Sequence, residues 1–198
     1  YEKAKLLRSW GRTSSLFSNS ESIEDRFKVN LEGIDYDAKF VFEEIGYQLE
    51  PSEISAAFAL IQLKNLPNNI KRRQEVFEDH TKFLSDYSQW LSLPQQTVSS
   101  HTGWLAYPII ISEKAPFKRR ELQIFLENRN IQTRVIFTGN ILRQPGFKSI
   151  NCVGRADEFE IADEVMKGGM LLACHHGLTE EHMQHIHSSM KVFFSNYQ

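Results

Sequence analysis

The clearest hydrophobic pattern lies in the second half of the chain, where two kinds of short apolar segment alternate. Residues Ile131 to Ile136 alternate apolar and polar positions, as a half-buried strand does. Similar patterns predict strands over Trp104–Ile111, Ile131–Phe137 and Gly169–Cys174, and helices over Phe117–Arg129, Ala156–Lys167 and Thr179–Phe194, with Thr179 as N-cap. This order predicts an α/β sandwich in which helices cover a three-stranded sheet.

The first half of the chain is predicted to be mainly helical. A short helix over Glu2–Trp10 ends at Gly11, which suits a C-cap, and the polar stretch Arg12–Lys39 predicts a long loop. Two further helices are predicted, Ile54–Leu66 and Asn68–Trp90. The second has one apolar stripe, whereas the first is apolar on nearly all sides and needs more protein around it than the next segment provides.

A polar, breaker-rich segment over Ser92–Thr102 predicts a domain boundary. We therefore divide the chain into residues 1–50, a helical linker over 51–92 and a small α/β domain over 93–198. The start of the sequence reads as the middle of a helix. We expect the chain to be the C-terminal part of a longer protein.

Composition and charge narrow the class of protein. A hydrophobic content of 41% allows a core, while a net charge of -2 and a pI near 6.4 give no field that would gather nucleic acid or an anionic membrane. The basic triplets Lys71–Arg73 and Lys118–Arg120 are interpreted as solvated helix faces. Cys152 and Cys174 have no CxxC spacing and no apolar run reaches membrane length, so a cytoplasmic setting is the default.

Candidate binding residues gather directly after the alternating segment. Arg134, Asn140, Arg143 and Gln144 offer two guanidinium groups and two amides, and Pro145 then prevents the chain from continuing as a helix. Such donors and acceptors suit phosphates and sugar hydroxyls. A solvated turn with an ordinary surface arginine is the alternative, and the pattern alone leaves both open.

The histidines form a second candidate group. His175 and His176 lie between the last predicted strand and the start of the last helix, where side chains can bind an anion; a loop with two polar residues is the alternative. A metal site at His182, His185 and His187 is disfavoured, because His187 lies on another helix face and no acidic or thiol partner has ligand spacing. The sequence has no GxSxG, P-loop or GxGxxG motif.

Four segments resemble the C-terminal half of the DegT-type sugar aminotransferases and their dehydratase relatives. They are LLRSWGR at 6–12, IGYQL at 45–49 leading into SEISAAF at 52–58, QTR through TGNILRQP at 132–145, and CHHGLTEE at 174–181. These relatives are fold-type I pyridoxal-phosphate enzymes that act on nucleotide-linked 4-keto-6-deoxy sugars. The TGNILRQP and HHGLTEE segments are more similar to the 3-dehydratase branch.

The resemblance implies that the cofactor, pyridoxal 5′-phosphate or pyridoxamine 5′-phosphate, is held mainly by an N-terminal large domain. The lysine that binds it covalently, or the histidine that replaces this lysine in dehydratases, is then expected upstream of Tyr1, so no catalytic residue is expected in this chain. Gln48 stands where the family typically has an Asn that reaches the cofactor phosphate of the neighbouring subunit, which implies a homodimer with shared active sites. Glu50 stands where many relatives have Arg.

The resemblance also implies the substrate contacts. It places Arg134, Asn140, Arg143, His175 and His176, together with Trp10 and Arg12, near a nucleotide-linked 4-keto sugar. The implied reaction is a C-3 dehydration in deoxysugar biosynthesis, including that of lipopolysaccharide O-antigens, and it is compatible with a reductase partner. The alternatives are an aminotransferase of the same fold and a non-catalytic binding or dimerisation module. We expect the chain alone to show no cofactor absorbance and to expose a large apolar surface.

Overall fold

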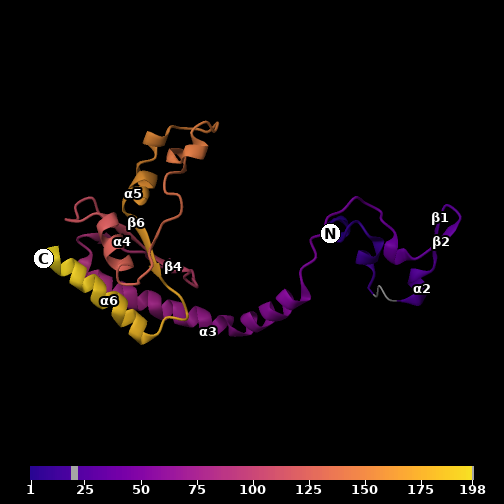
Figure 1. The fold of residues 1–198 in the computed structure, drawn as a ribbon, viewed down its shortest axis with the longest axis horizontal. Coiled ribbons are helices and arrows are strands. Elements are labelled where there is room, and N and C mark those ends of the chain that lie inside the picture. Colours follow the sequence, from indigo (N-terminus) through magenta and orange to yellow (C-terminus); the bar gives the residue numbers. More distant parts are fainter. Residues whose placement is uncertain (19–21, 198) are drawn as a thin grey trace. The chain divides into compact units, whose positions relative to one another are not determined.

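The computed structural model describes residues 1–18 and 22–197, which form parts of two compact units, Tyr1–Leu63 and Lys64–Gln198 (Figure 1). Helix α3, Glu53–Leu84, runs through the boundary between the units. In the described residues no helix has the length and apolar character needed to cross a membrane.

The first unit contains more regular structure than the predicted loop over Arg12–Lys39. Its elements are α1 (Glu2–Arg8), η1 (Thr13–Leu16), α2 (Ile23–Arg26), β1 (Val29–Leu31), β2 (Ile34–Tyr36) and η2 (Ala38–Phe40). Strands β1 and β2 form an antiparallel hairpin closed by Glu32 and Gly33, both with positive φ, at 51° and 92°. The loop prediction is therefore wrong here, because three-residue strands are too short to show a period and only the turn glycine marks the hairpin.

Two glycines allow the end of α1 to pack directly against a later segment of the first unit. Gly11 has a φ of 84°, and a Cβ built on it would lie 1.8 Å from the Glu44 carbonyl oxygen. A Cβ on Gly46 would lie 2.3 Å from the Gly11 nitrogen. This backbone-to-backbone crossing continues in bridges from Ser9 to Gln48 and from Arg12 to Phe42. The helix ends earlier than predicted, at Arg8 with Ser9 as its C-cap, so Gly11 is not the C-cap. Gly11 instead makes the crossing sterically allowed.

The second unit contains a four-stranded antiparallel sheet with strand order β3-β4-β6-β5. Its elements after α3 are η3 (Ser85–Tyr87), β3 (Leu91–Ser92), β4 (Ala106–Ile111), α4 (Arg119–Glu127), β5 (Arg134–Val135), η4 (Ile141–Arg143), η5 (Pro145–Phe147), η6 (Ala156–Glu158), α5 (Glu160–Gly168), β6 (Gly169–Ala173), α6 (Glu180–Phe194) and η7 (Ser195–Tyr197). The mixed α/β class is confirmed. The strand number of three is wrong, because β3 adds a short edge strand to β4.

The predicted strand Ile131–Phe137 is reduced to the two residues of β5. At its start, the Thr133 N–H donates to the Glu127 carboxylate at 2.6 Å. At its end, Phe137 adopts a positive φ of 44°. A side-chain acceptor on one side and a left-handed residue on the other therefore prevent a longer ladder.

Helix α3 is continuous, whereas the sequence predicted two helices separated at Pro67. Proline costs about 3 kcal/mol in a helix interior because it removes one backbone hydrogen bond and crowds the preceding turn. The turns after Pro67 are held by the buried side chains of Val76, Phe77, His80 and Leu84. The turns before it remain exposed, with Phe58 at 67% and Leu63 at 63% relative exposure.

The core of the second unit lies between the sheet and helices α3, α4 and α6. Strand β4 alternates regularly, with Tyr107, Ile109 and Ile111 facing inward. Helix α6 runs alongside the C-terminal half of α3 (Figure 1), and the His80 and His187 rings meet between them with Nδ1 and Nε2 3.0 Å apart. This packing fixes the position of the β6–α6 loop, which carries the histidine pair.

The basic triplets are not simply solvated helix faces, so that interpretation is wrong for three arginines. Arg72 donates to the Leu178 carbonyl oxygen at 2.8 Å, and Arg73 donates to the Trp104 and Cys174 carbonyl oxygens at 2.9 and 3.1 Å. Arg119 donates to the Met166 carbonyl oxygen at 2.7 Å. Guanidinium groups suit this task because their several fixed donors can satisfy carbonyl groups at strand and helix ends.

Thr179 caps α6 as predicted. Its side-chain oxygen accepts from the His182 N–H at 3.3 Å, and the His182 Nδ1 accepts from the Thr179 N–H at 3.2 Å. We expect Thr179→Ala to lower the free energy of unfolding by about 1 kcal/mol, because an N-cap acceptor is lost. Urea unfolding followed by circular dichroism would measure this, with Thr179→Ser as the control that keeps the cap. Equal stability of the alanine and serine variants would contradict the expectation.

Candidate functional site

A cavity of about 370 Å³ opens beside β5, β6 and the start of α6 in the second unit. Apolar side chains and polar side chains both line it. The apolar ones include Leu171, Leu172, Leu178 and Ile186, and the ionisable ones are Arg134, His175, His182 and His185. The structure therefore brings together two of the predicted site residues, Arg134 and His175.

Arg134 reaches the cavity from the edge strand of the sheet. Strand β5 pairs with β6 in antiparallel register, with Arg134 opposite Leu171. The Arg134 side chain is exposed, and no carboxylate in the described part of the chain forms an ion pair with it. Its charge is therefore available to a ligand.

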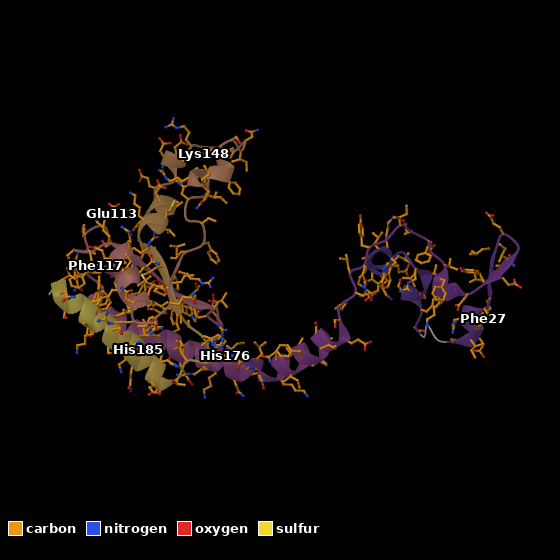
Figure 2. All side chains as sticks on the ribbon, viewed as in Figure 1. Phe27, Glu113, Phe117, Lys148, His176 and His185 are labelled. Atoms are coloured by element: carbon orange, nitrogen blue, oxygen red, sulfur yellow. The ribbon has the colours of Figure 1, made fainter. Side chains whose placement is uncertain are left out.

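His175 and His176 follow β6, with ring centroids 4.1 Å apart. Figure 2 labels His176. The His175 Nδ1 accepts from the Gly177 N–H at 3.0 Å, so the neutral ring carries its proton on Nε2. Desolvation, together with the nearby His176 and Arg73, lowers the pKa of His175. The His176 Nδ1 is buried and has no hydrogen-bond partner among the described residues.

Asn140 and Arg143 do not line this cavity. The Asn140 side chain is 2% exposed, and its Nδ2 donates to the Ala156 carbonyl oxygen and to Asp163, both at 2.8 Å. Arg143 forms an ion pair with the same Asp163 carboxylate. These bonds lower the pKa of Asp163 to about 2, chiefly through Arg143 and then Asn140. In this arrangement both amide hydrogens of Asn140 are used within the protein, and the cluster holds the segment between β5 and α5.

The remaining predicted residues lie at the backbone crossing of the first unit. The Arg12 guanidinium stacks over the Trp10 ring at 4.3 Å, and its buried Nε has no partner in the described structure. Gln48 is exposed on the crossing segment, and its Oε1 accepts from the Glu50 N–H at 3.3 Å. Glu50 itself accepts hydrogen bonds from Arg8 and Ser9.

The environment of Gln48 fits one contact of a cofactor phosphate. Its Oε1 is occupied by the backbone, which leaves the Nε2 hydrogens as donors toward an anion. The negative charge of Glu50 is partly offset by Arg8, with Nε and Oε1 3.2 Å apart.

The sequence did not identify two of the residues that line the cavity, His182 and His185, as ligand-binding residues. Both lie on the first turns of α6, and their common helix face was visible from their spacing. Their spacing suggested only a metal site, which the sequence disfavoured. Across the described ranges, no group of three or more histidine, cysteine or acidic side chains is arranged to hold a metal ion.

The sequence profile of the DegT/DnrJ/EryC1/StrS aminotransferase family matches residues 4–191. The chain belongs to this family. The match covers both units, including the Trp10–Arg12 segment, the β5 segment and the histidine loop. Membership explains why the four segments recognised in the sequence occur together in one chain.

Several curated members of the DegT family, whose names give different activities, are similar to this chain. The lipopolysaccharide biosynthesis protein RfbH of Salmonella typhimurium is 30% identical over 94% of this chain and 43% of its own length. The dTDP-4-dehydro-2,6-dideoxy-D-glucose 3-dehydratase of Saccharopolyspora spinosa is 32% identical over 94% of this chain and 41% of its own. A dTDP-4-amino-4,6-dideoxy-D-glucose transaminase of Shigella dysenteriae is 24% identical. The chain spans about two fifths of the length of the first two relatives.

Solved structures of DegT-family enzymes share the fold. The Escherichia coli GDP-4-keto-6-deoxy-D-mannose-3-dehydratase with bound hydrated PLP superposes with a TM-score of 0.71 at 23% identity, covering 92% of this chain and 45% of that one. A GDP-4-keto-6-deoxymannose-3-dehydratase with a trapped PLP-glutamate geminal diamine gives 0.72, covering 95% and 47%. These likenesses confirm the fold of the C-terminal part of a DegT-family enzyme.

Proposed function

We propose that the chain is the C-terminal part of a nucleotide-sugar 3-dehydratase that uses pyridoxal or pyridoxamine phosphate and acts on a nucleotide-linked 4-keto-6-deoxyhexose. The observation that supports this choice most is the 32% identity to a 3-dehydratase, against 24% to a sugar transaminase. An aminotransferase with the same fold is the alternative. A non-catalytic binding or dimerisation module is the alternative from another class.

The bound cofactor supplies an electron sink through which the C-3 hydroxyl can leave. The part of this chain is to position the substrate, because a correctly oriented reactant reacts faster. Arg134 supplies a fixed positive charge at the cavity, and His175 supplies an N–H on Nε2. The Gln48 amide would hold the cofactor phosphate of a second subunit in a homodimer through a hydrogen bond from its Nε2. The turns of α3 before Pro67 expose apolar side chains. In the full-length enzyme these side chains would pack against the large cofactor domain.

Product analysis of the full-length protein tests this proposal. The dehydratase hypothesis predicts a 3-deoxy product in which hydrogen has replaced the C-3 hydroxyl, with the two electrons supplied by the aminated cofactor that glutamate regenerates, whereas the aminotransferase hypothesis predicts an amino group in place of the ketone oxygen. Mass spectrometry after incubation with the cofactor, glutamate and the 4-keto sugar distinguishes the two. Turnover of neither kind, with no cofactor bound by the full-length protein, would favour the binding module.

We expect Arg134→Ala in the full-length enzyme to lower kcat/KM by about tenfold or more, because a charged hydrogen bond to the substrate is lost. Arg120→Ala is the matched control, since Arg120 is an exposed arginine on α4 that does not line this cavity. Steady-state kinetics measures the effect. Equal kcat/KM values for the two variants would remove Arg134 from the substrate site.

A further inference from the structure

The histidine loop, residues 173–178, obtains few hydrogen bonds from its own backbone. The β4–β6 ladder ends at Ala173, opposite Ala106. Beyond that point, the only backbone bond within the loop in the described part of the chain runs from the Leu178 N–H to the His175 carbonyl oxygen at 3.1 Å. Carbonyl groups that are shielded from water need partners, because an unpaired buried polar group costs free energy. The loop therefore depends on donors from other elements.

Arg73 of α3 holds the start of the histidine loop through two reciprocal bonds. Its Nη1 donates to the Cys174 carbonyl oxygen at 3.1 Å, and the Cys174 thiol donates to the Arg73 carbonyl oxygen at 3.3 Å. Cys174 is 1% exposed, and burial raises the pKa of its thiol to about 11, so the sulfur keeps the hydrogen that it donates. The same Nη1 donates to the Trp104 carbonyl oxygen at 2.9 Å, just before β4. Arg73 thus connects the start of the loop to α3 and to the segment that leads into β4.

Two further side chains of α3 hold the loop at its two ends. The Arg72 Nη2 and Nε both donate to the Leu178 carbonyl oxygen, at 2.8 and 3.2 Å. The His80 Nε2 donates to the Ala173 carbonyl oxygen at 2.9 Å. Three side chains of one helix therefore fix both ends of the loop that carries His175.

Arg73 also influences the charge of the His175 ring. Burial lowers the pKa of His175 most, and the charges of His176 and Arg73 lower it further. The neutral ring accepts from the Gly177 N–H at Nδ1 and keeps its hydrogen on Nε2. The positive charge of Arg73 therefore favours the form of His175 that the loop conformation accommodates.

We propose that Arg73 is a positioning residue of the substrate site, which acts through the histidine loop to hold His175 at the cavity. Arg73 itself is absent from the residues that line the cavity, whereas His175 is among them. A donor that is fixed before the ligand arrives loses less conformational freedom on binding. The inference rests on the proposed function, in which His175 donates to the substrate.

A double-mutant cycle in the full-length enzyme tests whether Arg73 acts through His175. We expect Arg73→Gln and His175→Ala each to lower kcat/KM for the 4-keto sugar by about tenfold. Because both changes remove the same contact, the double variant should fall no further than His175→Ala alone, whereas independent effects would multiply to about a hundredfold. Arg73→Gln should instead multiply with Arg134→Ala, since Arg134 is held by β5.

The matched control lies next to Arg73 on α3. Lys71→Gln removes one positive charge from the same basic triplet at an exposed residue, and it should leave kcat/KM unchanged. Thermal unfolding checks that each variant is folded. If Arg73→Gln does not fold, Arg73→Lys, which keeps the charge on a shorter side chain, takes its place in the same cycle.

Imidazole nitrogen shifts of the full-length protein with isotope-labelled histidine give a readout that needs no turnover. The His175 signal is identified by its loss in His175→Ala. In Arg73→Gln this signal should move toward the average of the two tautomers and should titrate at a higher pH, because the ring is less firmly held and a nearby positive charge is gone. Lys71→Gln should leave the signal unchanged.

The two readouts separate this inference from the proposed function. An unchanged His175 signal in Arg73→Gln would overturn the inference, and so would effects of Arg73→Gln and His175→Ala that multiply. A full-length protein that converts no 4-keto sugar would overturn the proposed function, while the His175 signal would still decide whether Arg73 holds the ring.

Discussion

Replacing Gly11 with alanine is expected to disrupt the backbone crossing of the first unit. The new Cβ would lie 1.8 Å from the Glu44 carbonyl oxygen, and the residue would have to keep a φ of 84°. Neither problem can be relieved by a rotamer change, because the clashing atom belongs to the backbone. We expect a loss above about 3 kcal/mol in local stability, at the upper end of single substitutions.

Hydrogen exchange locates this effect. The Trp10 N–H donates to the Tyr47 carbonyl oxygen at 2.9 Å, and the Tyr47 N–H donates to Leu7 at 2.7 Å, so both amides should lose protection in Gly11→Ala. Gly33→Ala is the matched control. It has a φ of 92° but no atom within 4 Å of the added Cβ, so only about 1 kcal/mol of backbone strain is expected at the hairpin. Equal loss of protection in both variants would show that strain, rather than the clash, is responsible.

The crossing also shows where sequence reasoning reached its limit. A helix ending shortly before Gly11 was predictable, because a glycine after an amphipathic segment is a local signal, although the predicted end at Trp10 lies two residues beyond the observed end at Arg8. The contact of Gly11 with Glu44 was not, because the partner lies far along the chain. A pattern within one segment gives the conformation of that segment and not its neighbour in space.

The same distinction holds in the second unit. Helix α6 and strand β4 were predicted within a few residues, since a Thr cap and a regular burial alternation are local features. The short β3 has too few residues to show a period. The shortening of β5 depends on the side chain of Glu127, and the continuity of α3 through Pro67 depends on core contacts made several turns later.

The candidate site was predictable only in part. Arg134 and His175 follow from their places at strand ends, and the structure brings them into one cavity. The sequence could not predict the bonds of Asn140 and Arg143 to Asp163, because that carboxylate lies 20 residues beyond Arg143. The substrate roles of all four residues stay predictions.

Acidification from pH 6.5 to 4 is expected to destabilise the second unit through His80. The His80 ring is 0% exposed, its Nε2 donates to the Ala173 carbonyl oxygen at 2.9 Å, and its Nδ1 faces the His187 Nε2. The neutral rings fit together if the His187 Nε2 carries a hydrogen that His80 accepts. If His80 were protonated, its Nδ1–H would instead face the Nε2–H of His187 across the α3–α6 interface, and neither could accept a hydrogen bond from the other.

The direction of the change in stability with pH follows from the pKa of His80. Burial lowers the pKa of His80 from 6.5 to about 4 in the folded chain. The unfolded state therefore binds more protons between these values, so stability is fully present above pH 6.5 and is lost as the pH falls toward 4, by up to about 3 kcal/mol. Burial also lowers the pKa of His187, so this residue adds a further loss of stability on acidification. Asp163, with a pKa of about 2 against 3.8, contributes only at lower pH.

A substitution separates His80 from every other titrating group. His80→Leu should cost about 1–3 kcal/mol at pH 7, because the Ala173 carbonyl oxygen and His187 lose a buried partner. It should also reduce the loss of stability between pH 6.5 and 4 to the part that His187 contributes, since the His80 ring is gone. His101→Gln, at an exposed histidine, should keep the full dependence. Urea unfolding at pH 7 and pH 4.5 compares the three chains, and a His80→Leu chain that loses as much stability on acidification as the unsubstituted chain would assign the dependence to other groups.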